Sequence, residues 1–307
     1  MSIRIGKATT PAELDAVFRL RHDVFTEEGI FDATGSGRFV DRFDAFPGVV
    51  NIVARVADEI IGTVRFMEYS EAGASADDWF DFTPYLPADG RIGSAGQLVV
   101  HKDHRSVPGL TVAMISMGYA WCLQRELTHL TGAANPEIAG FLKKSGWQFI
   151  GQEFLHRQRG VTVQPLVINL DHLNPRFQNF IRKQHIEHVF YEFERSLFRR
   201  GEMLCQIGDR ADSVYVVVDG KLRVTNREGR ELSQPGPGEI VGEIAILTDQ
   251  CRTANVESIR DTWVMMLSRE AFNKQLTENP GAARSVLELL ARRLASADST
   301  LKSSENP

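Results

Sequence analysis

Two opposite charges lie inside the apolar stretch "VGEIAILTDQCRTANV", residues 241–256. Glu243 and Arg252 stand nine positions apart there, among side chains that favour a core. The preceding glycines let backbone amides approach a ligand, and a short helix beginning near Glu243 would attract a phosphate. Arg252 offers a planar fork for two oxygens, and Glu243 can accept from a hydroxyl. The pattern predicts a small ligand with one phosphate beside one hydroxyl, or else two charges that merely pair with each other.

The helices and strands that must hold such residues are predicted from apolar periodicity and turn residues, and these patterns differ between the two halves of the chain. The first helix of residues 1–170 is predicted to begin near Thr10. Thr10 can cap it, Pro11 suits its first turn and Glu13 is at the capping-box position. Two strands joined at Ala57-Asp58 follow, and then strand, helix, strand, helix and strand. This order predicts an α/β sandwich with a mixed central sheet.

The second half begins with a helical connector, which we expect over residues 171–197. Short strands with frequent turn signals then predict an all-β unit over residues 198–297, with a hairpin turn at Asp219-Gly220 and helices near its end. Residues 298–307 are a polar tail. The predicted fold is therefore α+β, with two domains.

Composition limits the class of protein. The 307 residues are 43% hydrophobic and 24% charged, which is ordinary for a globular protein. The net charge of −5 does not indicate a general surface for binding nucleic acid. Three separated cysteines indicate reduced thiols and neither a disulfide frame nor a zinc site. No signal segment and no apolar run of about 18 residues occurs, so we expect a cytoplasmic protein without integral membrane contact.

The second half resembles the cyclic-nucleotide-binding domain of catabolite activator proteins, of the cAMP-dependent kinase regulatory subunit and of gated channels. The resemblance rests on "FRRGEMLCQIGDRADSVYVVVDGKLRV" and on "GEIVGEIAIL" followed by "CRTANV". It implies a β-roll with flanking helices and a cassette that holds a cyclic nucleotide. The cassette residues that it implies are Gly242, Glu243, Ile244, Ala245, Arg252 and Thr253.

In that family's arrangement, Glu243 would take the ribose 2′-hydroxyl and Arg252 the cyclic phosphate. Thr253 would contact a phosphate oxygen or the base, so cyclic AMP is expected and cyclic GMP stays open. Cys251 stands where the family often has proline.

The first half resembles GNAT acyltransferases through "GQLVVHKDHR" and "ANPEIAGFLKKSGWQFIG". Its segments "FRLRHDVFTEEG", "DRFD" and "GTVRFM" resemble acyl-homoserine-lactone synthases and N-acyl amino acid synthases, in which such motifs surround the acceptor's site. The resemblance assigns that site to Arg21, Phe25, Asp41, Asp44 and Arg65. It implies acyl transfer from acyl carrier protein or acyl-CoA to an amine, with Arg65 clamping an acceptor carboxylate. The alternative is a structural ion network at the junction of helix and sheet.

Several positions depart from the acyltransferase pattern. The usual coenzyme A loop is "RSVPGL" here, with Pro108 and Leu110 in place of glycines. The donor would then depend on Val99, Arg105 and Gly109. A tyrosine that often protonates the leaving thiolate is replaced by Leu142, and the lactone synthases' Glu and Arg are replaced by Ser94 and Gln97.

Such gaps leave His101, at the end of its strand, as a candidate base. They fit an acyl-carrier-protein donor, a solvent-assisted mechanism or a domain that has lost catalysis.

We therefore expect an N-acyltransferase regulated by a cyclic nucleotide, with the connector at residues 171–197 as the moving element. Two alternatives remain: a nucleotide-controlled protein lysine acetyltransferase, and a non-catalytic sensor with a degenerate first domain. No metal is expected, because His185 and His188 lack a third ligand nearby. No winged helix follows Ala297, which disfavours a nucleic-acid partner. The oligomeric state stays open.

Overall fold

The structure is a computed structural model that describes residues 2–70, 73–74, 76–77, 80–156, 160–173, 193–278, 280, 283–284, 286–288 and 290–291. The chain divides into two compact units, Met1–Gln178 with Glu194–Arg200 and Asn179–Phe193 with Gly201–Pro307. They are called unit 1 and unit 2 below, and each is described by itself.

The part of unit 1 that the structure describes contains three α-helices, and the first begins as predicted. In α1 (Pro11–Glu27), Thr10 is the N-cap, and Glu13 closes the capping box by accepting from the backbone of Thr10. The helix α2 (Leu110–Gln124) is almost wholly buried, and α3 (Pro136–Lys144) is the short late helix. All three lie where the apolar periodicity placed them.

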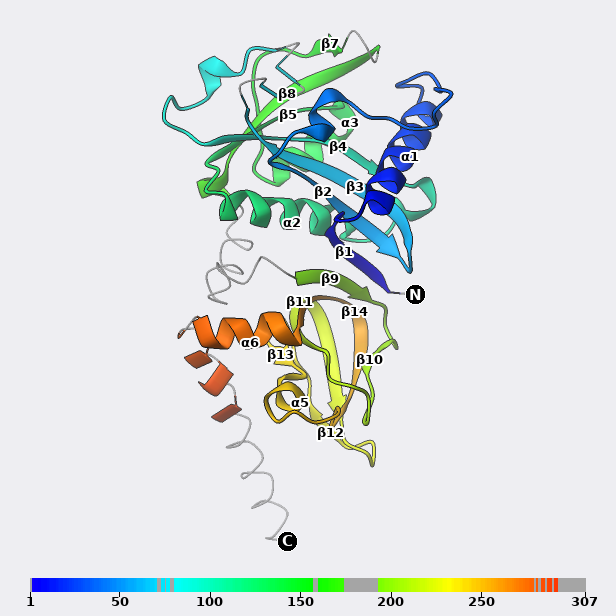
Figure 1. Cartoon of the computed structure of the whole chain (residues 1–307), viewed down its shortest axis with the longest axis vertical. Helices are drawn as coiled ribbons and strands as arrows, with labels where there is room; N and C mark the ends of the chain where they lie inside the picture. The colour runs from blue at the N-terminus through cyan, green and yellow to red at the C-terminus, as the bar shows by residue number, and fades with distance from the viewer. Residues whose placement is uncertain are drawn as a thin grey trace. The chain divides into compact units, whose positions relative to one another are not determined.

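The sheet of unit 1 runs β9-β1-β2-β3-β4-β5-β8-β6, and β7 pairs with β8 (Figure 1). Its strands are β1 (Ile3–Lys7), β2 (Val49–Val56), β3 (Glu59–Glu68), β4 (Ile92–Val100), β5 (His129–Ala134), β6 (Gln148–Phe149), β7 (Phe154–His156), β8 (Val161–Asn169) and β9 (Phe193–Phe198). The β4–β5 pair is parallel and the neighbouring pairs are antiparallel, so the sheet is mixed, as expected. The sequence pattern predicted neither β1 nor the position of β9.

Alternation along β3 separates the helices onto the two faces of this sheet. Gly62 and Phe66 face α2, where Met114 lies close to Gly62. A Cβ atom at Gly118 of α2 would lie 1.8 Å from the ring of Phe66, so this glycine makes room for the aromatic core. Arg65 points to the opposite face, toward α1. Arg65 thus pairs with Asp44 and lies near Arg21 on the face of the sheet that α1 covers.

Unit 2 is built on two long antiparallel strands, β11 (Ser213–Thr225) and β14 (Asn255–Ser268). The short strand β10 (Met203–Cys205) pairs with β14, whereas β12 (Glu231–Ser233) and β13 (Ile240–Val241) pair with β11. Unit 2 also contains the helices α5 (Glu243–Leu247) and α6 (Arg269–Glu278), and the described residues after α6 are helical too. The mainly β character of this unit is as predicted.

Two local predictions differ from the structure. The Asp219-Gly220 pair is not a hairpin turn, because β11 continues through it with register shifts against β14. Gly220 has φ of +107°, and a Cβ atom there would lie 2.5 Å from Cα of Thr262, so its role is close strand contact at a bulge. Phe193–Phe198 is a strand where the helical connector was expected. Residues 174–192, with His185 and His188, lie outside the described residues.

Candidate functional site

Four predicted residues of unit 1 come together in one ion cluster. The 3-10 turn η1 (Arg42–Ala45) presents two carboxylates, with Asp41 as its N-cap and Asp44 as the third residue after it. Nη1 of Arg21, on α1, lies 2.9 Å from Oδ1 of Asp44. Arg65, on β3, places Nη1 and Nη2 at 2.6 and 2.8 Å from the two oxygens of Asp41. Nη1 of Arg65 also lies 2.9 Å from Asp44.

Two amide side chains complete this cluster, and neither was predicted to belong to it. Asn51, opposite Arg65 in the β2–β3 register, accepts a hydrogen bond from Arg21. Nε2 of Gln97 donates to Oδ2 of Asp41 over 3.0 Å. A lone amide inside the apolar run "VVNIVARV" was the signal that could have marked Asn51.

Gln97 reaches Asp41 because β4 is bulged. Thr63 pairs with Val99 but Arg65 pairs with Gly96, so an extra residue is accommodated in β4 between these pairs. Gln97 has φ of +54°, a left-handed conformation that is unusual for a side chain of this kind. The bulge therefore aims the amide at the ion cluster.

The cluster is electrically balanced, with two guanidinium groups and two carboxylates. The side chains of Arg21, Arg65 and Asp44 are 0%, 2% and 1% exposed, whereas Asp41 keeps 22% of its side chain exposed. Burial lowers the pKa of Arg21, and the charge of Asp44 opposes that shift. Burial acts in the same direction on Arg65, but its carboxylate partners raise its pKa above the ordinary value. Asp41 is thus the member through which the cluster meets solvent or a ligand.

Acid should weaken the cluster through Asp41. Burial would raise the pKa of Asp41, but Arg65, by hydrogen bonds and charge, holds it below its ordinary value. The stabilisation is therefore present above the unfolded pKa and is lost as pH falls through the lower folded pKa. We expect the free energy of unfolding to fall below about pH 4, less steeply in Asp41→Asn. Denaturant unfolding between pH 7 and 3 measures this, and parallel profiles for the two proteins would contradict it.

The other predicted residues of unit 1 lie apart from the cluster. Phe25 and Val99 are core residues. His101 caps the turn η3 (Lys102–His104), four residues beyond Gln97 and so about 13 Å along the strand. Arg105 pairs with Glu28 at 2.8 Å.

Gly109, with φ of +75°, is the N-cap of α2. The glycine thus stands where the helix amides begin, although no side chain caps them there.

A cavity of about 440 Å³ lies beside Tyr69, just beyond the end of β3, and the sequence did not predict it. Tyr69 lies in its wall, and its hydroxyl contacts Asp77 at 2.7 Å and Thr131 at 2.9 Å. Thr131 stands opposite Ser94 in the last β4–β5 pair given by the register. The cavity is lined by Tyr69, Asp77, Phe80, Asp81, Phe82, Thr83 and Leu86.

The predicted cassette of unit 2 centres on a buried arginine. Arg252 is 4% exposed, and its Nη1 donates to the carbonyl of Gly242 over 2.9 Å and its Nη2 to that of Ser213 over 2.5 Å. Its Cζ lies 5.5 Å from the ring centroid of Tyr215. Two backbone carbonyls thus hold the guanidinium of Arg252. Its Nε has no hydrogen-bond partner among the described residues.

Glu243 begins α5 and is 0% exposed. Gly242, the N-cap of this helix, has φ of +85°, and a Cβ atom there would lie 2.3 Å from Nη1 of Arg252. Only glycine therefore allows the guanidinium to approach the start of the helix. Ala245 is buried, whereas Ile244 is 44% exposed and Thr253 is exposed.

No group of three or more metal-ligating side chains occurs in the part of the chain that the structure describes. Within the same described ranges, no helix is long and apolar enough to cross a membrane.

Comparison with known proteins separates the chain in the same way. Residues 16–169 match the family model described as N-acyl amino acid synthase FeeM, and residues 195–279 match the model of a cyclic nucleotide-binding domain. The solved structure of FeeM, an N-acyl amino acid synthase from uncultured soil microbes, is 13% identical with a TM-score of 0.49. That similarity covers 56% of this chain and 93% of FeeM.

The curated relatives align with different shares of this chain. The cyclic AMP receptor protein of Thermus thermophilus is 36% identical over 110 residues, which are 34% of this chain and 51% of that protein. Lysophospholipase nte1 of Neosartorya fischeri is 24% identical over 307 residues, which are 96% of this chain and 19% of that protein. The chain thus spans about a fifth of the length of this lysophospholipase.

Proposed function

Because this chain belongs to the N-acyl amino acid synthase FeeM family and also carries a cyclic nucleotide-binding domain, we propose that it is an N-acyltransferase controlled by a cyclic nucleotide. The reaction would move an acyl group from a thioester of acyl carrier protein or coenzyme A to the amine of a small amino compound. The nitrogen–carbonyl bond forms as the carbon–sulfur bond breaks, and the amine's proton leaves with the thiol.

The nucleotide proposal rests on Arg252 and its surroundings. Backbone carbonyls orient the guanidinium without neutralising its charge, so an anionic phosphate is a fitting further partner. Glu243, at the start of α5, would accept from a ribose hydroxyl, and Thr253 is exposed where it could meet the phosphate or base. We infer cyclic AMP as the ligand, in keeping with the name of the Thermus thermophilus receptor.

The donor would lie where β4 and β5 separate. Their parallel register ends at Ser94 and Thr131, although β4 continues to Val100 and β5 to Ala134. A Cβ atom added at Gly96 would have no neighbour within 4 Å, so space adjoins the strand just beyond that last pair. The thioester carbonyl would be polarised by backbone N–H groups at this gap. Gly109 and the first amides of α2 would meet the donor's phosphate.

The acceptor would meet Asp41. Its carboxylate is the exposed edge of the cluster and is held ionised by Arg65, so it can bind an ammonium group and orient the amine. Its lowered pKa makes it a weak base at neutral pH, and a solvent molecule would then take the proton, because His101 lies about 13 Å further along the strand. Both nitrogens of the Arg65 fork already bind Asp41, so a carboxylate clamp by Arg65 would require Asp41 to move.

The observation that carries the enzyme proposal is the open space beside Gly96, next to the bulge that aims Gln97 at Asp41. Gly96→Val should fold like the wild type, because its Cβ atom would meet no heavy atom within 4 Å. It should raise KM for the acyl donor about tenfold or more by filling the slot. A thiol-release assay with acyl carrier protein and acyl-CoA donors of several chain lengths measures this. An unchanged KM in the folded variant would place the donor elsewhere.

One observation favours a second candidate, a nucleotide sensor without catalysis. The ion cluster is balanced by its own members, as a structural network would be. Wild-type protein that binds cyclic AMP but releases thiol from none of the donors, acetyl-CoA included, would support that function.

A further inference from the structure

The last strand of unit 1 comes from the start of the nucleotide-binding sequence. Residues 195–279 match the cyclic nucleotide-binding model, yet Glu194–Arg200 belongs to unit 1. There β9 pairs antiparallel with β1, and Ile3, Arg4 and Ile5 face Leu197, Ser196 and Arg195. Unit 2 resumes at Gly201. The chain thus passes from the acyltransferase sheet directly into the nucleotide-binding unit.

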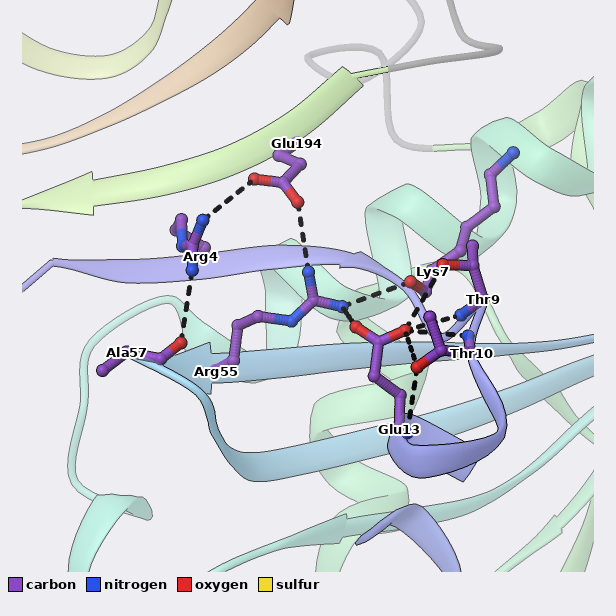
Figure 2. A network of polar contacts seen from close by, with 8 residues as sticks. All are labelled: Arg4, Lys7, Thr9, Thr10, Glu13, Arg55, Ala57 and Glu194. Atoms are coloured by element: carbon purple, nitrogen blue, oxygen red, sulfur yellow. Dashed lines mark hydrogen bonds and ion pairs between the residues drawn. The ribbon is translucent and has the colours of Figure 1, made fainter. Parts of the chain in front are cut away.

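An ion relay leads from β9 across β1 (Figure 2). Oε1 of Glu194 lies 3.1 Å from Nη1 of Arg55, on β2. The strand order places β1 between β9 and β2, so this contact passes over β1. The ion pair lies directly over Gly6, because a Cβ atom there would be in van der Waals contact with Glu194 at 3.5 Å and with Arg55 at 3.6 Å.

The same arginine reaches the first turn of α1. Nη2 of Arg55 lies 2.8 Å from Oε1 of Glu13 and donates to the carbonyl of Lys7 over 3.2 Å. The other oxygen of Glu13 accepts from the amides of Thr9 and Thr10 at 2.8 and 3.0 Å, as Figure 2 shows. Arg55 is 11% exposed at its side chain, so solvent screens it little. Glu194, Arg55 and Glu13 therefore link β9 to the start of α1.

The two elements that the relay contacts also carry residues of the ion cluster. Arg21 lies eight residues beyond Glu13 on α1, about 12 Å along one rigid helix. Asn51, which binds Arg21, lies four residues before Arg55 on β2. A displacement of Arg55 can therefore act on the cluster from two sides.

We propose that Glu194 transmits the nucleotide-bound state of unit 2 to the acyl-transfer site, through Arg55 and Glu13. Nucleotide binding would change the ion pair between Glu194 of β9 and Arg55. The ion pair between Arg55 and Glu13, in the first turn of α1, would change with it. This proposal rests on the proposed function, and it makes Glu194 a positioning residue without contact to either ligand. By linkage, an acyl donor or acceptor that favours one arrangement would change nucleotide affinity by the same factor.

Hydrogen exchange of the full chain, with and without saturating cyclic AMP, tests the relay. In the wild type, cyclic AMP should protect the cassette at residues 242–253 and also change exchange at residues 9–16. In Glu194→Gln, cassette protection and nucleotide affinity should stay within about twofold, while the change at residues 9–16 disappears. Gly6→Val, which obstructs the contact, should act similarly. Glu126→Gln, whose carboxylate pairs with exposed Arg91, is the matched control and should behave like the wild type.

The acyl-transfer rate gives a second readout. Glu194→Gln should keep the basal rate within about twofold and lose most of its response to cyclic AMP. A full response in this variant, or an unaltered segment 9–16 in wild type with a protected cassette, would overturn the relay alone. An unprotected cassette in wild type would overturn the nucleotide proposal and the relay with it.

Discussion

Replacement of Arg252 by alanine is expected to weaken cyclic AMP binding by about 100-fold or more. Removing one partner of a buried, charge-assisted hydrogen-bonded pair usually costs about 2–5 kcal/mol, and each 1.4 kcal/mol is tenfold in affinity. Arg252→Lys keeps the charge but loses the two-pronged geometry, so it should lie between the wild type and the alanine variant. Isothermal titration calorimetry with cyclic AMP and cyclic GMP measures both affinities and the preference.

Arg260→Ala is the matched control for this variant. Nη2 of Arg260 donates to a backbone carbonyl in unit 2, that of Gly220, over 2.9 Å. Arg260 lies outside the predicted cassette, so its loss should leave the affinity for cyclic AMP near the wild-type value. Thermal unfolding of each variant shows whether it is folded at the temperature of titration. Wild-type affinity in a folded Arg252→Ala protein would remove the cassette proposal.

The second large effect concerns stability, and Asp44 should show it. Its side chain is 1% exposed and contacts both guanidinium groups of the cluster. Asp44→Asn would leave two buried cations facing one carboxylate, and breaking a buried pair of this kind costs about 3–5 kcal/mol. We therefore expect the free energy of unfolding to fall by that amount in denaturant titrations at pH 7.

Asp15→Asn provides the comparison for Asp44→Asn. Asp15 pairs with Arg19 and Arg38 at the surface and is 36% exposed, so its loss should change stability much less than the loss of Asp44. Asp41→Asn should separate structure from function, since its exposed edge predicts a smaller loss of stability but a large loss of acyl transfer. Equal destabilisation by all three variants would contradict the division of roles within the cluster.

The grouping of Arg21, Asp41, Asp44 and Arg65 was expected from the resemblance to the synthase families, because these residues come from three separate segments of the sequence. Local spacing accounts only for Asp41 and Asp44, which are a cap and its third residue and so lie on one turn. The capping box of α1 was predictable from such spacing as well.

Features that depend on pairing between distant strands could not be predicted. The Asp219-Gly220 pair has the composition of a hairpin turn, but contact with β14 made it a bulge within one strand. The position of β9 beside β1 joins segments nearly 190 residues apart in the sequence, and no local pattern encodes that pairing. Gln97 joined the cluster through a bulge that its own sequence does not announce. The relay through Glu194 and Arg55 therefore became visible only in the folded sheet.

The central claim is that a cyclic nucleotide bound by unit 2 changes the rate of acyl transfer by unit 1. The most direct measurement is the rate of thiol release at fixed donor and amine concentrations as cyclic AMP is increased. We predict a saturable change in rate, with a midpoint near the calorimetric Kd, which is absent from Arg252→Ala. A rate that stays constant while calorimetry shows the wild-type cassette to be saturated would contradict the claim.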